Sequence, residues 1–223
     1  MRTVIIGGGS LDMDVAEALI DEDDDTTIVA ADRGLDYCRL LHIKPFMAIG
    51  DFDSVSKSTR DLLDSFEQDE VKVVRLNPVK DDSDLEAALN YVLCNTIQGD
   101  IYLLGATGSR LDHVLGNLSL LALAARHDRH CYMVDRTNRI RLIRAGETVL
   151  IKKNEQYGKY VSLLPVFGKC EGVRATGVYY PLDNAVIGDG KSYFTLTISN
   201  EITSSIASFS VATGSLILIE SKD

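Results

Sequence analysis

The first 130 residues alternate short runs of β-branched residues with segments of helical periodicity, and few folds accommodate that order. Strands that alternate with helices imply parallel βαβ units, in which helices cover both faces of the sheet. Three helical stretches separate the strands, so we expect an α/β domain with a parallel sheet. The strands are predicted at Thr3–Ile6, Thr27–Ala31, Phe46–Ile49, Val71–Leu76 and Ile101–Leu104.

Two of the helical stretches are well defined by their apolar spacing. Asp84–Asn95 is amphipathic, with Ser83 and Glu86 in capping-box spacing at its start. Leu111–Ala125 is apolar on almost every side and is therefore expected to be buried. Ser109 and Asp112 have capping-box spacing at the start of this second helix.

The pattern changes after about residue 135, where short alternating runs are punctuated by glycine. Such runs are typical of an antiparallel sandwich or barrel. The charge changes too: residues 1–130 hold 24 acidic and 12 basic side chains, whereas residues 131–223 hold 9 and 11. We therefore predict an α/β domain over residues 1–135 and an all-β sandwich over 136–223. The later strands are predicted at Thr148–Lys152, Tyr160–Leu164, Val173–Tyr180, Tyr193–Ser199, Ser205–Val211 and Leu216–Ile219.

The overall charge and the cysteine pattern exclude several classes of protein. A net charge of −10 argues against a nucleic-acid or anionic-membrane binder, because phosphate groups would be repelled. No apolar stretch is long enough for a membrane span or a signal peptide, so we expect a cytoplasmic protein. The four cysteines form no CxxC pair, which favours reduced and mostly buried thiols over disulfides or a zinc site.

Polar, small or charged residues follow each predicted strand of the first domain. In an open parallel sheet, ligands bind beyond the carboxyl ends of the strands, and all these segments would share that edge. The sequence therefore predicts one site there. The segments are residues 7–10, 32–34, 50–54, 80–84 and 105–113.

The acidic residues in these segments indicate a metal site. Asp51 and Asp53 are two apart on an extended segment, so their carboxylates can face one point, although a turn or capping role is equally open. Asp81 and Asp84 lie at a helix start, where capping alone would explain one acid. Lys80 opposes the helix dipole there unless it binds an anion, which favours a shared site for magnesium and phosphate.

The last segment resembles a phosphate cradle. Gly105 and Gly108 allow the backbone to approach a ligand closely, and Arg110 can bind a phosphate in bidentate fashion. His113 and Asn117 lie one turn apart on one helix face, although a core role for the histidine is equally open. Neither GxGxxG nor GxxxxGK[ST] occurs, so we expect phosphoryl chemistry on a magnesium-bound nucleotide held in another way.

Taken in order and spacing, these segments resemble the thiamine pyrophosphokinases of bacterial type. The resemblance spans nearly the whole chain. It lies in AADRG (30–34), KPFMAIGDFDS (44–54), KDDSDLEAAL (80–89), LLGATGSRLDHVLGNL (103–118), Ser199 with Asn200, and the glycine-led final strand at 214–219.

The resemblance implies a fold, a reaction and a set of site residues. It implies an α/β nucleotide-binding domain and a β-sandwich in a homodimer that binds thiamine between its subunits. The diphosphate group of ATP would be transferred to thiamine with magnesium, giving thiamine diphosphate and AMP. Ser199 and Asn200 would contact the aminopyrimidine ring, while Asp112 and His113 would face the reacting hydroxyl or the phosphates. The expected magnesium residues are Asp51, Asp53 and Asp84 with Asp81 nearby, and the expected ATP residues are Asp32, Lys80, Thr107, Gly108, Arg110 and Asn117.

Departures from the family pattern and two rival functions remain. The chain has no tryptophan, which animal members stack on thiamine, and Arg33 stands where many members have glycine, so it is expected to be an extra phosphate contact. Arg110 and Lys80 would stabilise charge on the leaving group, and Asp112 is a candidate general base. A magnesium-dependent phosphohydrolase would suit the same acidic cluster. A nucleotide-binding regulator without enzymatic activity is the second alternative.

Overall fold

The computed structural model describes residues 1–22, 25–68, 71–77, 82–95, 99–165, 168–190 and 197–223. Contacts between residues divide the chain into two compact units, Met1–Arg136 and Thr137–Asp223. A sheet with helices in the first unit and antiparallel sheets in the second confirm the predicted order of architectures.

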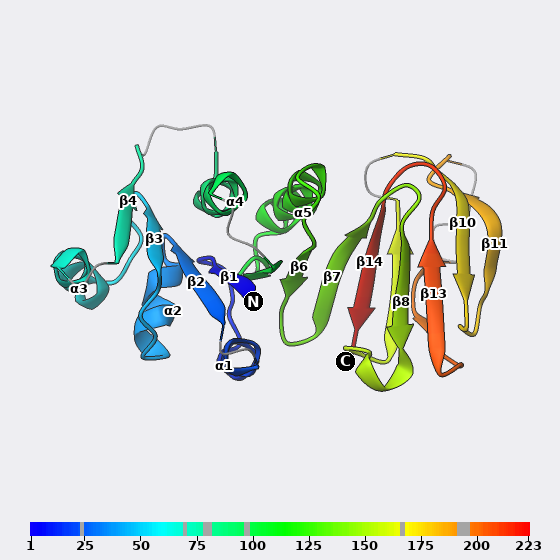
Figure 1. Ribbon diagram of the computed structural model, residues 1–223, viewed down its shortest axis with the longest axis horizontal. Helices are drawn as coiled ribbons and strands as arrows, with labels where there is room; N and C mark the ends of the chain where they lie inside the picture. The colour runs from blue at the N-terminus through cyan, green and yellow to red at the C-terminus, as the bar shows by residue number, and fades with distance from the viewer. Residues whose placement is uncertain (23–24, 69–70, 78–81, 96–98, 166–167, 191–196) are drawn as a thin grey trace. The chain divides into compact units, whose positions relative to one another are not determined.

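The first unit is built around a parallel sheet (Figure 1). Its strand order is β6-β5-β1-β2-β3-β4, so β1 lies in the interior of the sheet. The residues of β1 from Thr3 to Ile6 are all buried, as expected for a strand with helices on both faces. The strands are β1 (Arg2–Ile6), β2 (Thr26–Ala31), β3 (Met47–Gly50), β4 (Lys72–Arg75), β5 (Asp100–Leu104) and β6 (Cys131–Val134).

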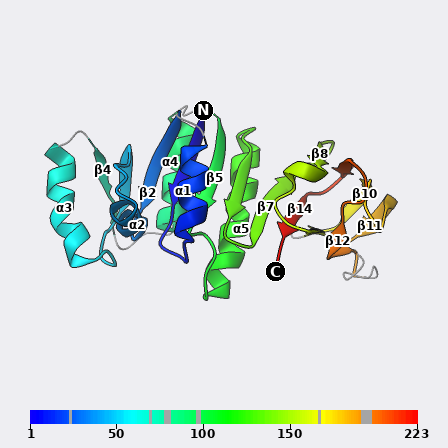
Figure 2. The same cartoon turned by 90° about the horizontal axis from the view of Figure 1, so that it is seen from below.

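Helices cover both faces of this sheet. Figures 1 and 2 show α1 and α2 on one face and α4 on the other, and α4 also packs against α5. The Ser83 hydroxyl accepts a hydrogen bond of 3.1 Å from the Glu86 backbone, which confirms this predicted cap. The helices are α1 (Met13–Asp21), α2 (Gly34–Leu40), α3 (Lys57–Gln68), α4 (Asp84–Cys94) and α5 (Leu111–Arg126).

Two predictions about α5 were wrong. The helix is not buried on all sides, because Leu111 and Leu115 are 66% and 57% exposed. Only Leu120, Leu121 and Ala124 are buried, so the first half of the helix projects from the sheet. Arg110 rather than Ser109 occupies the N-cap, and no side chain caps this helix.

The second unit consists of two antiparallel sheets with one hydrophobic cluster between them. The sheet orders are β12-β9-β14-β7 and β11-β10-β13-β8. Buried side chains from both sheets, such as Leu163 of β9 and Phe209 of β13, belong to the same cluster. The strands are β7 (Asn138–Ile143), β8 (Thr148–Lys152), β9 (Tyr160–Leu164), β10 (Cys170–Thr176), β11 (Leu182–Ile187), β12 (Asn200–Glu201), β13 (Ile206–Ser210) and β14 (Leu216–Ser221), with a short 3-10 helix, η1 (Lys153–Glu155).

Some strands of this region differ from the predicted ones. The strand predicted at Tyr193–Ser199 falls partly on residues outside the described ranges, and residues 197–199 are not strand. The chain becomes extended only at Asn200, where β12 pairs with β9. Strands β7 and β11 of this unit were not predicted, because charged and amide side chains interrupt their apolar residues. Strand β6 of the first unit was not predicted either.

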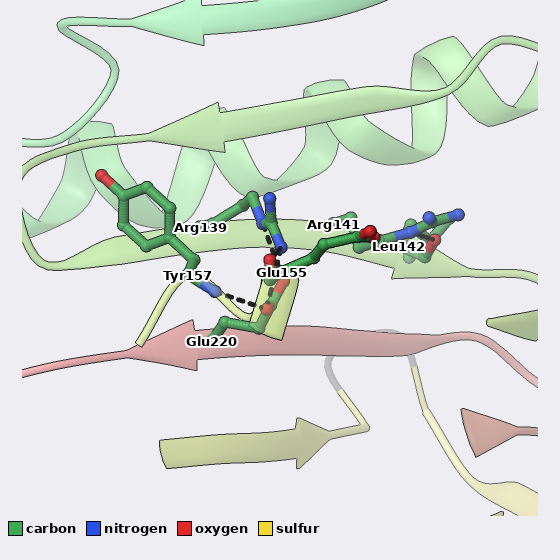
Figure 3. A network of polar contacts seen from close by, with 6 residues as sticks. All are labelled: Arg139, Arg141, Leu142, Glu155, Tyr157 and Glu220. Carbon is green, nitrogen blue, oxygen red and sulfur yellow. Dashed lines mark hydrogen bonds and ion pairs between the residues drawn. The ribbon is translucent and has the colours of Figure 1, made fainter. Parts of the chain in front are cut away.

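A buried ion pair joins β7 to β14 near the end of the chain. Arg139 donates to both carboxylate oxygens of Glu220, at 2.7 and 2.9 Å (Figure 3). The backbone nitrogen of Tyr157 donates to the same carboxylate at 2.9 Å. Glu220 is only 3% exposed, so this bidentate pairing satisfies a carboxylate that would otherwise be buried at high cost.

The cysteines agree with the expectation of reduced and mostly buried thiols. All four cysteines are free thiols, and Cys38, Cys131 and Cys170 are buried while Cys94 is exposed. Within the described parts of the chain, no helix combines the length and the apolar character that a membrane crossing needs.

Candidate functional site

Two glycine-rich loops interlock at the carboxyl edge of the sheet. The loop after β1 donates from Gly9 to the Gly105 carbonyl at 2.8 Å and from Ser10 to the Thr107 carbonyl at 2.9 Å. A Cβ atom on Gly9 would lie 2.4 Å from the Gly105 oxygen, so only glycine allows the two backbones to approach this closely. The Tyr37 hydroxyl donates to the Gly9 carbonyl at 2.8 Å and holds the loop from the other side.

These loops form part of the wall of a cavity of about 650 Å³ in the first unit. Its walls come from the ends of β1, β2 and β5 and from the first turns of α4 and α5. Lys80 and Asp81, both predicted for the site, lie outside the described residues. The predicted residues that line the cavity are Asp32, Arg33, Asp84, Thr107, Gly108, Arg110, His113 and Asn117.

Three carboxylates gather beside this cavity. One oxygen from each of Asp32, Asp51 and Asp53 lies within 4.8 Å of the other two. Asp53 donates its backbone N–H to an Asp51 carboxylate oxygen at 3.1 Å, and the Ser54 hydroxyl donates to Asp32. The sequence predicted that Asp84 lies with Asp51 and Asp53, whereas the third carboxylate of the cluster is that of Asp32. Asp84 lines the cavity, and its charge contributes to raising the pKa of Asp32.

The environment of Asp32 suits a bound cation. Burial is the main cause that raises the pKa of Asp32, and the Asp84 and Asp51 charges raise it further. Its Oδ1 atom is buried and has no hydrogen-bond partner among the described residues. A buried carboxylate oxygen without a partner, with other carboxylates close by, is stabilised by a divalent cation. The donor set therefore fits magnesium, which prefers oxygen ligands.

Arg110 and Asp112 form an exposed ion pair at the start of α5. The Arg110 guanidinium donates to both carboxylate oxygens of Asp112, at 3.3 and 2.7 Å. This hydrogen bond lowers the pKa of Asp112, which makes the carboxylate a weaker proton acceptor. Further along the helix, Asn117 donates to the Ala106 carbonyl at 2.7 Å, so it supports the glycine-rich loop. His113 is exposed rather than a core residue.

Ser199 and Asn200 lie in the second unit and differ in their surroundings. Asn200 is 6% exposed, and its side chain pairs with the Tyr180 backbone in both directions, at 2.9 and 2.8 Å. Ser199 is exposed and has a left-handed backbone with φ of 54°. Its backbone N–H donates to the Ser162 hydroxyl at 3.0 Å. Asn200 is therefore committed to holding Tyr180, whereas the Ser199 side chain faces solvent.

Two features of the site were not predicted from the sequence: Asp32 as a member of the carboxylate cluster, and the hydrogen bond from Tyr37 to the loop after β1. Asp32 directly follows a predicted strand and lies at the same sheet edge as Asp51, so the position of loops after parallel strands already indicated that the two could meet. The tyrosine carries no such signal, because its contact with Gly9 joins positions 28 residues apart.

Comparison with known proteins gives matches over both units. Residues 21–133 match the family model described as thiamin pyrophosphokinase, catalytic domain. Residues 147–217 match the one described as thiamin pyrophosphokinase, vitamin B1 binding domain. The thiamine pyrophosphokinase of Bacillus subtilis (strain 168) is 32% identical over 232 residues, covering 100% of both chains.

Solved structures agree with these matches. The crystal structure of thiamine pyrophosphokinase from Bacillus subtilis superposes with a TM-score of 0.87 at 30% identity, covering 100% of both chains. That of thiamin pyrophosphokinase from Geobacillus thermodenitrificans gives 0.84 at 34% identity, covering 100% of this chain and 98% of that one.

Proposed function

Because this chain belongs to the thiamine pyrophosphokinase family, we propose that its reaction takes place at the cavity of the first unit. The enzyme transfers the diphosphate group of ATP to the hydroxyl group of thiamine, giving thiamine diphosphate and AMP. The main support for this location is the cluster of three carboxylates, Asp32, Asp51 and Asp53, beside a cavity lined by glycine-rich loops. Residues 1–135 form the ATP-binding catalytic domain in this proposal, and residues 136–223 bind thiamine.

Magnesium is the proposed cofactor, held by Asp32, Asp51, Asp53 and Asp84. The unpartnered Oδ1 atom of Asp32 supports this assignment, since buried oxygens of this kind need a donor or a cation. A bound magnesium ion would supply charge neutralisation for the phosphates. Asp81 is proposed to lie near the ion on the strength of the family resemblance alone.

ATP is proposed to bind along the glycine-rich loops, with the cationic side chains around its phosphates. The close approach of the Gly9 and Gly105 backbones leaves a smooth wall, which suits a polyphosphate chain. Arg33 and Arg110 line the same cavity and supply positive charge for it, as Lys80 would. Arg110 binds Asp112 through Nε and Nη2, so its remaining guanidinium donors can serve a phosphate while the ion pair is kept. Thr107, Gly108, His113 and Asn117 complete the proposed ATP site.

Charge stabilisation is the main contribution that this site offers to the reaction. The lowered pKa of Asp112 disfavours a strong general-base role. Phosphoryl transfer through a loose transition state needs little proton removal at that point. We therefore propose that Asp112 orients Arg110 and the reacting hydroxyl, while the cations stabilise the AMP leaving group.

Thiamine is proposed to contact the second unit at Ser199. The exposed hydroxyl supports this role, whereas Asn200 would act by fixing the adjacent Tyr180. Ser199→Ala should raise the KM for thiamine more than the KM for ATP, because only the thiamine complex loses a hydrogen bond. Equal changes in both constants would argue against the assignment.

A homodimer with thiamine between the subunits, in the cytoplasm, completes the proposal. The exposed Leu111 and Leu115 of α5 support the dimer, since a partner would shield them from water. Four free thiols support a reducing compartment. Analytical ultracentrifugation would test the dimer directly, and a monomer at micromolar concentration would contradict it.

A steady-state assay of AMP release tests the proposed site. Release of AMP from ATP should depend on thiamine and on magnesium. Asp51→Asn should reduce turnover at least a hundredfold, an order of magnitude or more beyond the loss of one hydrogen bond. Phosphate release that ignores thiamine would indicate a phosphohydrolase. Full activity of a folded Asp51→Asn variant would remove that residue from the site.

A further inference from the structure

The segment Asp51–Ser56, which we call the acidic loop, has a constrained backbone. It leaves the sheet after β3 and enters α3, and it carries two carboxylates of the proposed magnesium site. Phe52 between them has a left-handed backbone with φ of 59°, although its side chain is 3% exposed. A bulky residue rarely adopts this conformation, and its surroundings must impose it.

Contacts from two helices hold the acidic loop at both ends. Arg60 of α3 donates from one guanidinium nitrogen to the Phe52 carbonyl at 3.1 Å and to the Asp53 carbonyl at 3.0 Å. At the other end, Asp36 of α2 accepts from the Ser56 hydroxyl at 2.7 Å and from the Ser56 backbone nitrogen at 3.1 Å. The helix that follows the loop thus reaches back to fix the peptide groups around Asp53.

We propose that Arg60 is a positioning residue for the magnesium site: it fixes the backbone on both sides of Asp53 and so keeps this carboxylate beside Asp51 and Asp32. The inference rests on the magnesium site proposed above. In this role Arg60 acts through the backbone, because it donates to the Phe52 and Asp53 carbonyls. Both bonds come from a single guanidinium nitrogen, Nη2, so the reach of the arginine side chain brings one donor group to two carbonyls.

The charge of Arg60 provides a sharp test of this role. A positive charge near a cation site repels the cation, so its removal would by electrostatics alone strengthen metal binding. Loss of positioning has the opposite effect, because partners that orient metal ligands typically contribute about 10-fold to 100-fold in affinity. The two mechanisms therefore predict opposite signs for Arg60→Gln.

Lys57 offers a matched control on the same helix. It is exposed, and within the described part of the chain its side chain makes no hydrogen bond or ion pair. Lys57→Gln removes the same unit of charge close to the acidic loop and leaves the Arg60 contacts intact. Any effect of net charge on metal binding should appear in both variants.

The experiment is titration of the full-length protein with Mn²⁺, with free Mn²⁺ measured by electron paramagnetic resonance. Arg60→Gln should bind Mn²⁺ about tenfold more weakly than the natural sequence. Lys57→Gln should bind it equally or more tightly. Circular dichroism melting curves identify variants that fail to fold, and Arg60→Lys then serves as the second variant. A lysine keeps the charge, but its side chain is shorter and cannot place a nitrogen where Nη2 of Arg60 lies, so this variant should also bind Mn²⁺ more weakly.

Two results would overturn the inference, and they are distinguishable. Arg60→Gln or Arg60→Lys binding Mn²⁺ as tightly as the natural sequence would show that the loop needs no such support. Absence of Mn²⁺ binding in the natural sequence would instead remove the proposed magnesium site, and the role of Arg60 with it.

Discussion

Substitution of Gly9 by alanine tests whether the interlocked glycine loops shape the cavity proposed to bind ATP. The added Cβ would lie 2.4 Å from the Gly105 carbonyl oxygen and 2.5 Å from the Thr107 oxygen. Both atoms belong to the backbone, so no side-chain rotation can relieve the contacts. The loop must therefore move away from its neighbour, and the wall of the cavity moves with it.

The cost of Gly9→Ala follows from the contacts that this movement breaks. Backbone hydrogen bonds of 2.8 Å from Gly9 and 2.9 Å from Ser10 join the two loops. Each contributes about 1 kcal/mol to the free energy of unfolding. Steric overpacking adds about 1 to 3 kcal/mol. We expect Gly9→Ala to lower the free energy of unfolding by about 3 kcal/mol or more.

Urea unfolding followed by circular dichroism, together with calorimetric titration of ATP, would measure both consequences. The affinity for ATP should fall by about tenfold, because a shift of the wall misplaces the phosphates. Gly116→Ala is the control: a Cβ at this position in α5 meets nothing within 4 Å, so alanine should stabilise the helix by about 0.5 to 1 kcal/mol. Unfolding free energies of Gly9→Ala and Gly116→Ala that agree within about 0.5 kcal/mol would refute the packing argument.

Three further substitutions test the roles of individual ionised carboxylates in activity and stability. Asp53→Asn should abolish AMP release while leaving the melting temperature unchanged or raised, because it relieves repulsion between carboxylates. Burial alone would raise the pKa of Asp36, but hydrogen bonds from the Ser56 and Thr59 hydroxyl groups together lower it below 3.8. The ionised Asp36 should therefore stabilise the folded protein fully above about pH 5. This stabilisation should be lost as the pH falls through 3.8 and below. Urea unfolding of the natural sequence and of Asp36→Asn at a series of acidic pH values would show the two unfolding free energies converge. Glu220→Gln should lower the free energy of unfolding by about 2 to 3 kcal/mol, since Arg139 loses its buried partner.

Each of these three has its own contradicting outcome. Strong AMP release by a folded Asp53→Asn variant would exclude that carboxylate from the site. A stability difference for Asp36→Asn that does not shrink toward low pH would contradict the role of its ionised form. Asp183→Asn breaks an exposed ion pair with Arg174 and should cost less than about 0.5 kcal/mol. A Glu220→Gln variant no worse than this control would contradict the buried-pair argument.

Local patterns predicted most of the elements that surround the site. The strand at 101–104 and the helices from Asp84 and Leu111 were predicted within a residue or two, because apolar periodicity reports burial directly. The burial of α5 was misjudged for a related reason. Its apolar residues are spread around the helix, and the sequence does not show which side meets the sheet.

The alternation of strands and helices already predicts that acidic and glycine-rich segments meet at one edge of a parallel sheet, because every loop that follows a parallel strand lies at that edge. Which of the carboxylates come together depends on how the strands pack beside one another. Asp32 joins Asp51 and Asp53 because the adjacent strands β2 and β3 end side by side, whereas Asp84 begins α4 and lines the same cavity as Asp32. The loop contacts of Arg60 and Tyr37 likewise depend on packing between elements, which no local pattern encodes.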